Sequence, residues 1–152
     1  MRVSAKTDYA IRAAIELAAV EDGAPLKGER IATAQSIPLR FLENILMALR
    51  HAGLVESRRG ADGGYRLAKP ADQVAVADVI RAIDGPLANV SGVRPERLAF
   101  AGAAEPMRDV WIASRAALRG VLEGVTLADV VAGELPAHVR GLLDDEDAWV
   151  SH

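Results

Sequence analysis

An apolar stripe at helical spacing opens the chain. Its members recur at the i, i+3, i+4, i+7 and i+8 positions, at Ile11, Ala14, Ile15, Ala18 and Ala19. This spacing predicts an α-helix with one face toward a core. Ser4 is placed to cap the helix, and a turn at residues 22–25 ends it. A short second helix is predicted over Gly28–Gln35.

Residues 38–52 carry the most regular pattern of the sequence, and Pro38 suits the first position of a helix. Four apolar residues form one stripe, namely Leu42, Ile45, Leu46 and Leu49. Four others share the opposite side, namely Arg40, Glu43, Asn44 and Met47. Gly53 then stands at a C-cap position. The pattern predicts a helix that packs with one face and contacts a ligand with the other.

Two short strands are predicted at residues 54–59 and 65–69, and the glycine-rich segment 60–64 between them favours a hairpin turn. A helix, a short turn, a second helix and a basic hairpin follow one another in the order of a winged helix-turn-helix. We therefore expect a mainly α fold with a small β wing.

The next segment predicts a helix followed by a long loop. An apolar stripe from Val76 to Ile83 is closed by Gly85 and Pro86. Residues 87–105 show no sustained periodicity. A loop of this length in a compact protein is usually functional or mobile.

Pro106 opens a long helix whose apolar positions need a cover. We expect the cover to be the same helix of a second copy, because homodimers predominate among soluble oligomers. The candidate dimerisation residues are Val110, Trp111, Leu118, Val121 and Leu122. Trp111 fits either this seam or the wall of an effector pocket.

Thr126 and Asp129 resemble a capping box for a short last helix, Leu127–Ala132, which Gly133 stops. The tail beyond it contains an acidic run at residues 144–147 and is predicted to be solvated and mobile.

The 152 residues contain no cysteine, which excludes disulfides, thiol nucleophiles and cysteine-ligated iron–sulfur clusters. None of His51, His138 and His152 has a partner at metal-ligand spacing, so no metal site is predicted. Neither a catalytic residue set nor a phosphate-binding loop is evident, and we expect no enzyme. No apolar stretch reaches the roughly 18 residues of a bilayer span, and no secretion signal is recognisable, so we expect a cytoplasmic protein without a membrane partner.

The net charge of −3 conceals an asymmetry along the chain. Residues 1–70 carry 11 basic and 8 acidic side chains, a balance of +3, whereas residues 71–152 carry 7 and 13, a balance of −6. Because salt screens charges beyond roughly 8 to 10 Å, a local basic surface decides contact with phosphate. The acidic total therefore does not exclude DNA binding.

Residues 59–67 read RGADGGYRL and resemble the wing of the Rrf2 family of bacterial transcription regulators, whose pattern is approximately R-G-x-x-G-G-Y-x-L. Residues 4–10, 41–55 and 78–85 are similar to three other family segments in the same order. The four blocks cover about residues 2–86, and a weaker match extends over the long helix and residues 126–130.

The resemblance implies a homodimer whose two winged heads grip a pseudo-palindromic operator in double-stranded DNA. It divides the chain into a DNA-binding domain (1–86), a loop (87–105), a dimerisation helix with a short last helix (106–133) and a tail (134–152). The candidate DNA-binding residues are Pro38, Arg40, Phe41, Asn44, Arg50, Arg58, Arg59, Gly60, Lys6 and Tyr9.

These residues suit different contacts. Arg40 can bind guanine, and Asn44 adenine, through two hydrogen bonds each, whereas Phe41 fits the core equally well. Arg58 and Arg59, the latter at the family's wing arginine, suit a narrow minor groove. Pro38 departs from the family's usual serine and removes a capping hydroxyl, so the operator preference is expected to differ.

Many members of the family hold an iron–sulfur cluster through three cysteines in the loop, whereas residues 87–105 contain neither Cys nor His. We therefore expect no cofactor. The expected function is that of a DNA-binding repressor controlled by a small-molecule effector or a partner enzyme, as in the cysteine-free branch of the family. The alternative is a protein-interaction module that keeps the winged fold without reading DNA, which Asp62 and the acidic second half favour.

Overall fold

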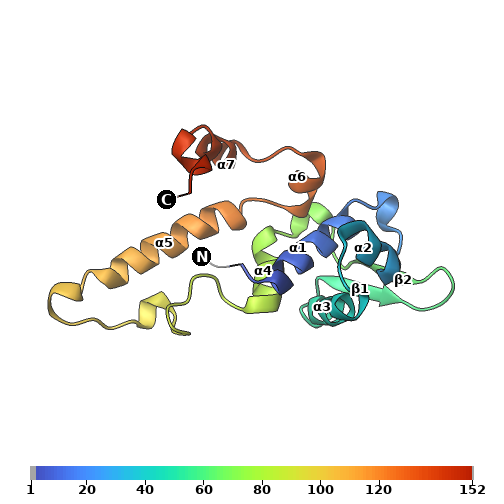
Figure 1. Ribbon diagram of the computed structural model, residues 1–152, viewed down its shortest axis with the longest axis horizontal. Coiled ribbons are helices and arrows are strands. Elements are labelled where there is room, and N and C mark those ends of the chain that lie inside the picture. The colour runs from blue at the N-terminus through green and yellow to red at the C-terminus, as the bar shows by residue number, and fades with distance from the viewer. Residues whose placement is uncertain (1–2, 152) are drawn as a thin grey trace.

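The computed structural model describes residues 3–151 as a helical head, a hairpin wing and a long projecting helix (Figure 1). The helices and strands are α1 (Ala5–Ala18), α2 (Gly28–Gln35), α3 (Leu39–His51), β1 (Val55–Arg58), β2 (Gly64–Leu67), α4 (Val76–Asp84), α5 (Met107–Leu122), α6 (Leu127–Ala132) and α7 (Ala137–Arg140). This order confirms the predicted mainly α fold with a small β wing. Within residues 3–151, none of the helices combines the length and the hydrophobicity needed to span a bilayer.

The head is built around α1, which contacts α2, α3, α4, α6 and β2. Small residues let these elements approach, because Ala10 and Ala13 are fully buried. The four apolar residues predicted for the packing face of α3 are also fully buried, namely Leu42, Ile45, Leu46 and Leu49. Burial of this stripe fixes which side of α3 faces outward.

A buried hydroxyl joins α1 to α4. Ser4 caps α1 by accepting a hydrogen bond from the backbone N–H of Thr7 (3.1 Å). The Thr7 hydroxyl in turn donates to Oδ2 of Asp84, the last residue of α4. Since the Thr7 side chain is fully buried, this hydrogen bond locks the relative positions of the two helices.

The wing is anchored to the segment before α2. Strands β1 and β2 pair antiparallel, with Val55 opposite Leu67. Leu26 then forms an isolated bridge with Tyr65, in which each backbone N–H donates to the other residue's carbonyl at 2.8 Å. Gly64 has a φ of +150° at this crossing, and a Cβ there would lie 2.5 Å from the Leu26 oxygen. The close approach of the two backbones therefore requires glycine.

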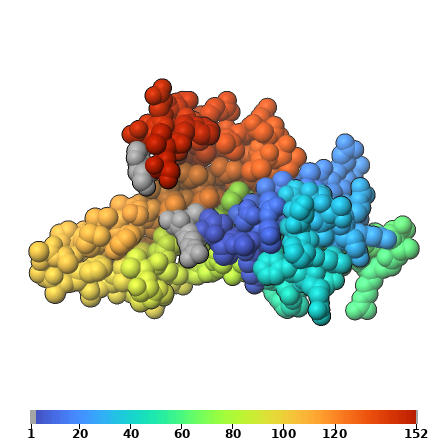
Figure 2. All heavy atoms as spheres, viewed as in Figure 1, coloured from blue at the N-terminus to red at the C-terminus, as the bar shows by residue number. Residues whose placement is uncertain are grey.

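Helix α5 projects from the head, and no residue along it is buried. Figure 2 shows the wing and the segment around residue 100 at opposite ends of the molecule. The chain returns to the head at α6, where Thr126 and Asp129 form the predicted capping box and Leu127 is fully buried. The Leu127 N–H donates to the Val74 carbonyl (2.9 Å) and closes this return.

The tail is more structured than the sequence predicted. Instead of a wholly solvated segment, the chain forms α7 after Pro136 and buries Val139. The His138 ring places Nε2 3.0 Å from the Gly120 carbonyl oxygen on α5. The acidic run at residues 144–147 predicts a solvated tail, whereas the apolar Val139 and the proline that precedes α7 determine the local structure.

Replacing Gly64 with alanine should destabilise the head by about 1–3 kcal/mol, because the added methyl group meets the Leu26 backbone as well as an unfavourable φ. Urea unfolding followed by circular dichroism measures the loss. Gly60→Ala is the matched control, since Gly60 also has a positive φ (+107°) but open space around it. Equal losses in the two variants would contradict a role for the close approach.

Candidate nucleic-acid interface

The N-terminus of α3 has no side-chain cap, and polar residues are exposed in its first turns. Pro38 occupies the N-cap position without a side-chain hydrogen bond, and the first turn contains no acidic residue. Arg40 and Asn44 are exposed one turn apart, and the Asn44 amide donates to the Arg40 carbonyl (3.2 Å). A helix N-terminus with free N–H groups and a nearby guanidinium favours anions such as phosphate.

Phe41 is held in place by α1 rather than buried in the core. Its ring meets the Tyr9 ring edge-on, with centroids 5.7 Å apart and planes at 86°. The Arg12 guanidinium lies over the Tyr9 ring, 4.7 Å from the centroid of that ring, and pairs with Asp8 at 2.8 Å. Because Phe41 remains 39% exposed, this contact positions an apolar surface beside the polar face of α3.

A shallow hollow gathers part of the predicted residue set. It is lined by Tyr9, Pro38, Arg40, Phe41 and Asn44. The sequence reasoning missed Arg12, which also donates to the Gln35 carbonyl (2.9 Å) and so ties α1 to the end of α2. Arg12 follows Asp8 by four residues and Tyr9 by three on the same helix. This spacing is the sequence signal that could have identified Arg12.

The wing presents a second group of cations. Arg58 and Arg59 are exposed and have no ion pair within residues 3–151. Arg66 differs, since it pairs with Glu56 across the hairpin. The turn between the strands is tight, because a Cβ on Gly63 would lie 2.2 Å from the Arg58 carbonyl oxygen. The hairpin therefore carries two unpaired guanidinium groups toward its tip.

Lys6 and Arg50 complete the predicted set at the two ends of the head's helices. Lys6 lies in the first turn of α1 and Arg50 in the last turn of α3, and both are exposed. Neither lines the hollow around Phe41. Both positions suit contact with a phosphate backbone more than contact with a base.

Of the predicted dimerisation residues, Val110 and Trp111 lie on an exposed part of α5, whereas Leu122 packs against the buried cluster of Ala77, Ile80 and Leu87. Val110 is 49% and Trp111 36% exposed, and Leu118, Val121 and Leu122 are half-buried. A 16-residue helix without a single buried residue has apolar surface available for a partner.

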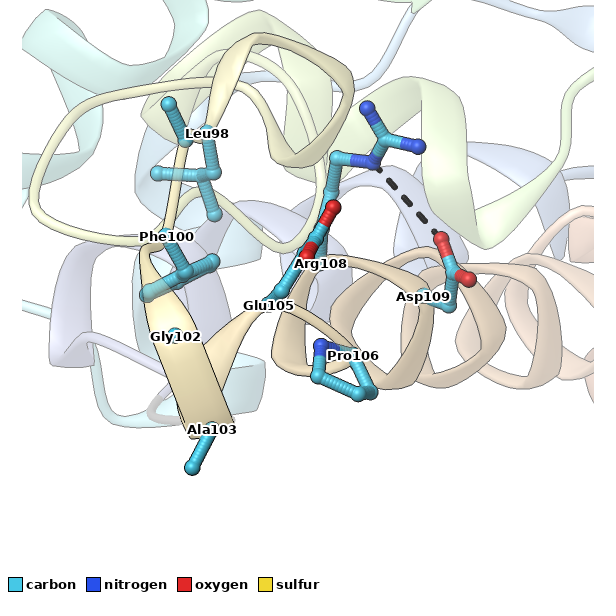
Figure 3. Close-up of a pocket in the computed structure, with 9 residues that line it drawn as sticks. Leu98, Phe100, Gly102, Ala103, Glu105, Pro106, Arg108 and Asp109 are labelled. Atoms are coloured by element: carbon cyan, nitrogen blue, oxygen red, sulfur yellow. Dashed lines mark ion pairs between the residues drawn. The ribbon is translucent and has the colours of Figure 1, made fainter.

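The loop and the start of α5 line a pocket that offers no ligands for an iron–sulfur cluster (Figure 3). Its polar side chains are Glu105, Arg108 and Asp109, and Arg108 lies 3.6 Å from the Asp109 carboxylate. Iron–sulfur clusters are held by thiolates, which this chain lacks altogether. Within residues 3–151 there is also no group of three or more His, Cys, Asp or Glu side chains arranged to hold a metal ion. An iron–sulfur cluster therefore does not fit this loop.

A carboxylate joins α4 to α5. Glu123 accepts hydrogen bonds from Arg81 of α4 and from Arg119 of α5. These two guanidinium groups, Arg81 first, hold the pKa of Glu123 below its ordinary value. In the loop, a backbone hydrogen bond of Glu96 and then the Arg115 guanidinium lower the pKa of the Glu96 carboxyl. Ion pairs thus link the head, the loop and the projecting helix.

Comparison with known proteins decides the family. Residues 3–133 match the model of the Rrf2 family, described as an iron-dependent transcriptional regulator. The chain belongs to the Rrf2 family. A Mycobacterium tuberculosis protein named as an HTH-type transcriptional regulator is 49% identical over 151 residues, which cover 99% of this chain and 94% of the relative.

Solved structures of Rrf2 regulators share the fold. The structure of CymR, the global cysteine regulator of B. subtilis, has a TM-score of 0.75 at 34% identity and covers 88% of this chain and 98% of its own. T. potens IscR has a TM-score of 0.68 at 31% identity and covers 100% and 93%. This Rrf2 protein is a DNA-binding transcriptional regulator and not an enzyme. The family therefore favours DNA binding over the alternative of a winged interaction module.

Acid should weaken the link between α4 and α5. Because the folded pKa of Glu123 lies below the ordinary 4.5, its ion pairs stabilise the fold fully above about pH 4.5, and the stabilisation is lost as pH falls through the folded pKa. Glu123→Gln should melt at a lower temperature than the wild type at pH 7, and the difference should shrink toward pH 4. Thermal melts followed by circular dichroism measure it.

Glu134→Gln is the control, because Glu134 is exposed and outside the ion pairs found within residues 3–151. Its melting temperature should follow the wild type at each pH. A Glu123→Gln deficit that stays constant from pH 7 to pH 4 would show that its carboxylate charge does not stabilise the junction.

Proposed function

We propose that this Rrf2 regulator is a homodimeric transcriptional repressor that binds a pseudo-palindromic operator with two copies of α3 and the wing. The observation that carries the proposal is the sorting of α3 into a fully buried apolar face and an exposed face with Arg40 and Asn44. A helix of this kind docks in the major groove while a dimer spaces two such helices.

Each part of the head takes a different contact in this proposal. Arg40 and Asn44 read base edges, Phe41 lies against an apolar base surface such as a thymine methyl, and Pro38 brings the N-terminus of α3 close to the duplex. Arg58 and Arg59 enter the minor groove next to Gly60. Lys6, Tyr9 and Arg50 contact the phosphate backbone and fix the register without reading sequence.

The projecting helix supplies the dimer. Val110, Trp111, Leu118 and Val121 follow one side of α5 over about three turns, and pairing this face with a second copy removes apolar surface from water. Bound across a promoter in the cytoplasm, such a dimer represses by occluding it. Release then follows when a metabolite or a partner protein changes the geometry of the two heads, without an iron–sulfur cluster.

Arg40 and Arg59 should separate sequence reading from phosphate contact. Against an operator fragment, Arg40→Ala should reduce discrimination at one base pair by about 1–3 kcal/mol. Arg59→Ala should instead weaken binding to all duplexes and lower the salt dependence by about one unit of slope. Fluorescence anisotropy at several salt concentrations, with operator and scrambled duplexes, measures both.

Arg97→Ala is the control for these variants, because Arg97 is exposed in the loop segment after α4, away from the wing. It should bind DNA as the wild type does. If Arg40→Ala and Arg59→Ala also bind as the wild type does, α3 and the wing are not the DNA-binding surface.

The dimer should depend on α5. Leu118→Asp places a charge on the apolar face and should convert the dimer to a monomer in sedimentation velocity, with loss of operator binding. Ala116→Asp is the matched control, since Ala116 is exposed on the same helix but points away from this face. A wild-type protein that sediments as a monomer at micromolar concentration would refute the dimer itself.

A further inference from the structure

A second cavity lies where α4, the loop and α5 meet, and its charged lining is unusual. It has a volume of about 230 Å³. The charged side chains around it come from all three segments: Arg81, Arg94, Glu96, Arg115 and Arg119. Four arginines thus line one small space.

The carboxylates nearby do not balance this charge. Glu96 pairs with Arg115 at 2.5 Å, and Glu123 at the edge of the cavity pairs with both Arg81 and Arg119. Arg94 has no ion pair within residues 3–151. Asp78 also pairs with Arg81, at 3.6 Å. Four positive charges against three negative ones leave an excess of one, and the Arg115 side chain is only 22% exposed.

Helical spacing places this cluster beside the predicted dimer face. Arg115, Arg119 and Glu123 follow one another at intervals of four residues and form one stripe along α5 toward the loop and α4. Val110 and Val121 lie on the opposite side of the helix from Arg119, whereas Trp111, Leu118 and Leu122 border the stripe. A second copy centred on Val110 and Val121 would leave the arginine cluster to be filled from solution.

We propose that this cavity is a binding site for a small oxyanion, such as a phosphate, a sulfate or a short dicarboxylate. Guanidinium groups recognise such ligands through paired hydrogen bonds, and the net positive charge of the cavity favours an anion. The volume lies below the roughly 300–1,000 Å³ of sites for drug-sized ligands, which favours a compact anion.

Binding here deepens the proposed function and, in its regulatory part, rests on it. An anion that draws Arg81 of α4 and Arg119 of α5 toward itself competes with Glu123 for both groups. The ion-pair bridge that Glu123 forms between α4 and α5 then changes. The spacing of the two heads in a dimer changes with it. A ligand that binds the two arrangements unequally shifts operator affinity.

Titration calorimetry of the DNA-free protein tests the site with inorganic phosphate, sulfate and succinate, each against chloride at matched ionic strength. We expect one saturable site per chain for at least one of the three probes. Arg94→Gln should weaken that binding roughly tenfold or more, because it removes charge-assisted hydrogen bonds without breaking an ion pair. Arg97→Gln, on the same turn but outside the cavity, should leave it unchanged.

Arg59→Ala separates this cavity from the wing and should retain full anion binding. Absence of saturable binding for all three probes, or equal loss in Arg94→Gln and Arg97→Gln, would overturn the proposal. Loss in Arg59→Ala alone would place the anion on the wing and would overturn it as well. Since these titrations contain no DNA, they fail or succeed independently of operator binding.

Discussion

Close packing against the small-residue face of α1 is the constraint on which the rest of the structure depends. Ala10 and Ala13 are fully buried, and this lets α2, α3, α4 and α6 contact one helix at the same time. A larger side chain at either position would separate these elements, because protein interiors leave no room for added methylenes. The orientation of α3, and with it the exposed position of Arg40, follows from that packing.

The same helix also connects the two functional ends of the molecule. On one side, Tyr9 holds the Phe41 ring at the edge of the α3 face, and Arg12 covers Tyr9. On another side, the buried Thr7 hydroxyl binds Asp84 at the end of α4, three residues beyond Arg81. Helix α1 therefore contacts both α4 and the candidate DNA face, and it is the element through which the proposed coupling would pass.

Periodicity predicted the head well because its helices bury clean apolar stripes. The expected helix at residues 38–52 agrees with α3 within one residue at each end, and the capping box of α6 forms as its residue types require. The wing strands are shorter than predicted, and α7 was missed. Four-residue elements depend on tertiary contacts such as the Leu26–Tyr65 bridge, which no local pattern encodes.

The distribution of charge shows the same limit of prediction from local sequence patterns. Residues 71–152 have a balance of −6, and this acidity by itself favours a protein-interaction role. Yet four of the seven basic residues in that half line one cavity, at positions 81, 94, 115 and 119. They come from a helix, a loop and a second helix, so their spacing along the chain gives no motif. Because screening restricts electrostatics to about 10 Å, the potential that a ligand meets depends on this local grouping and not on the charge of the half that contains it.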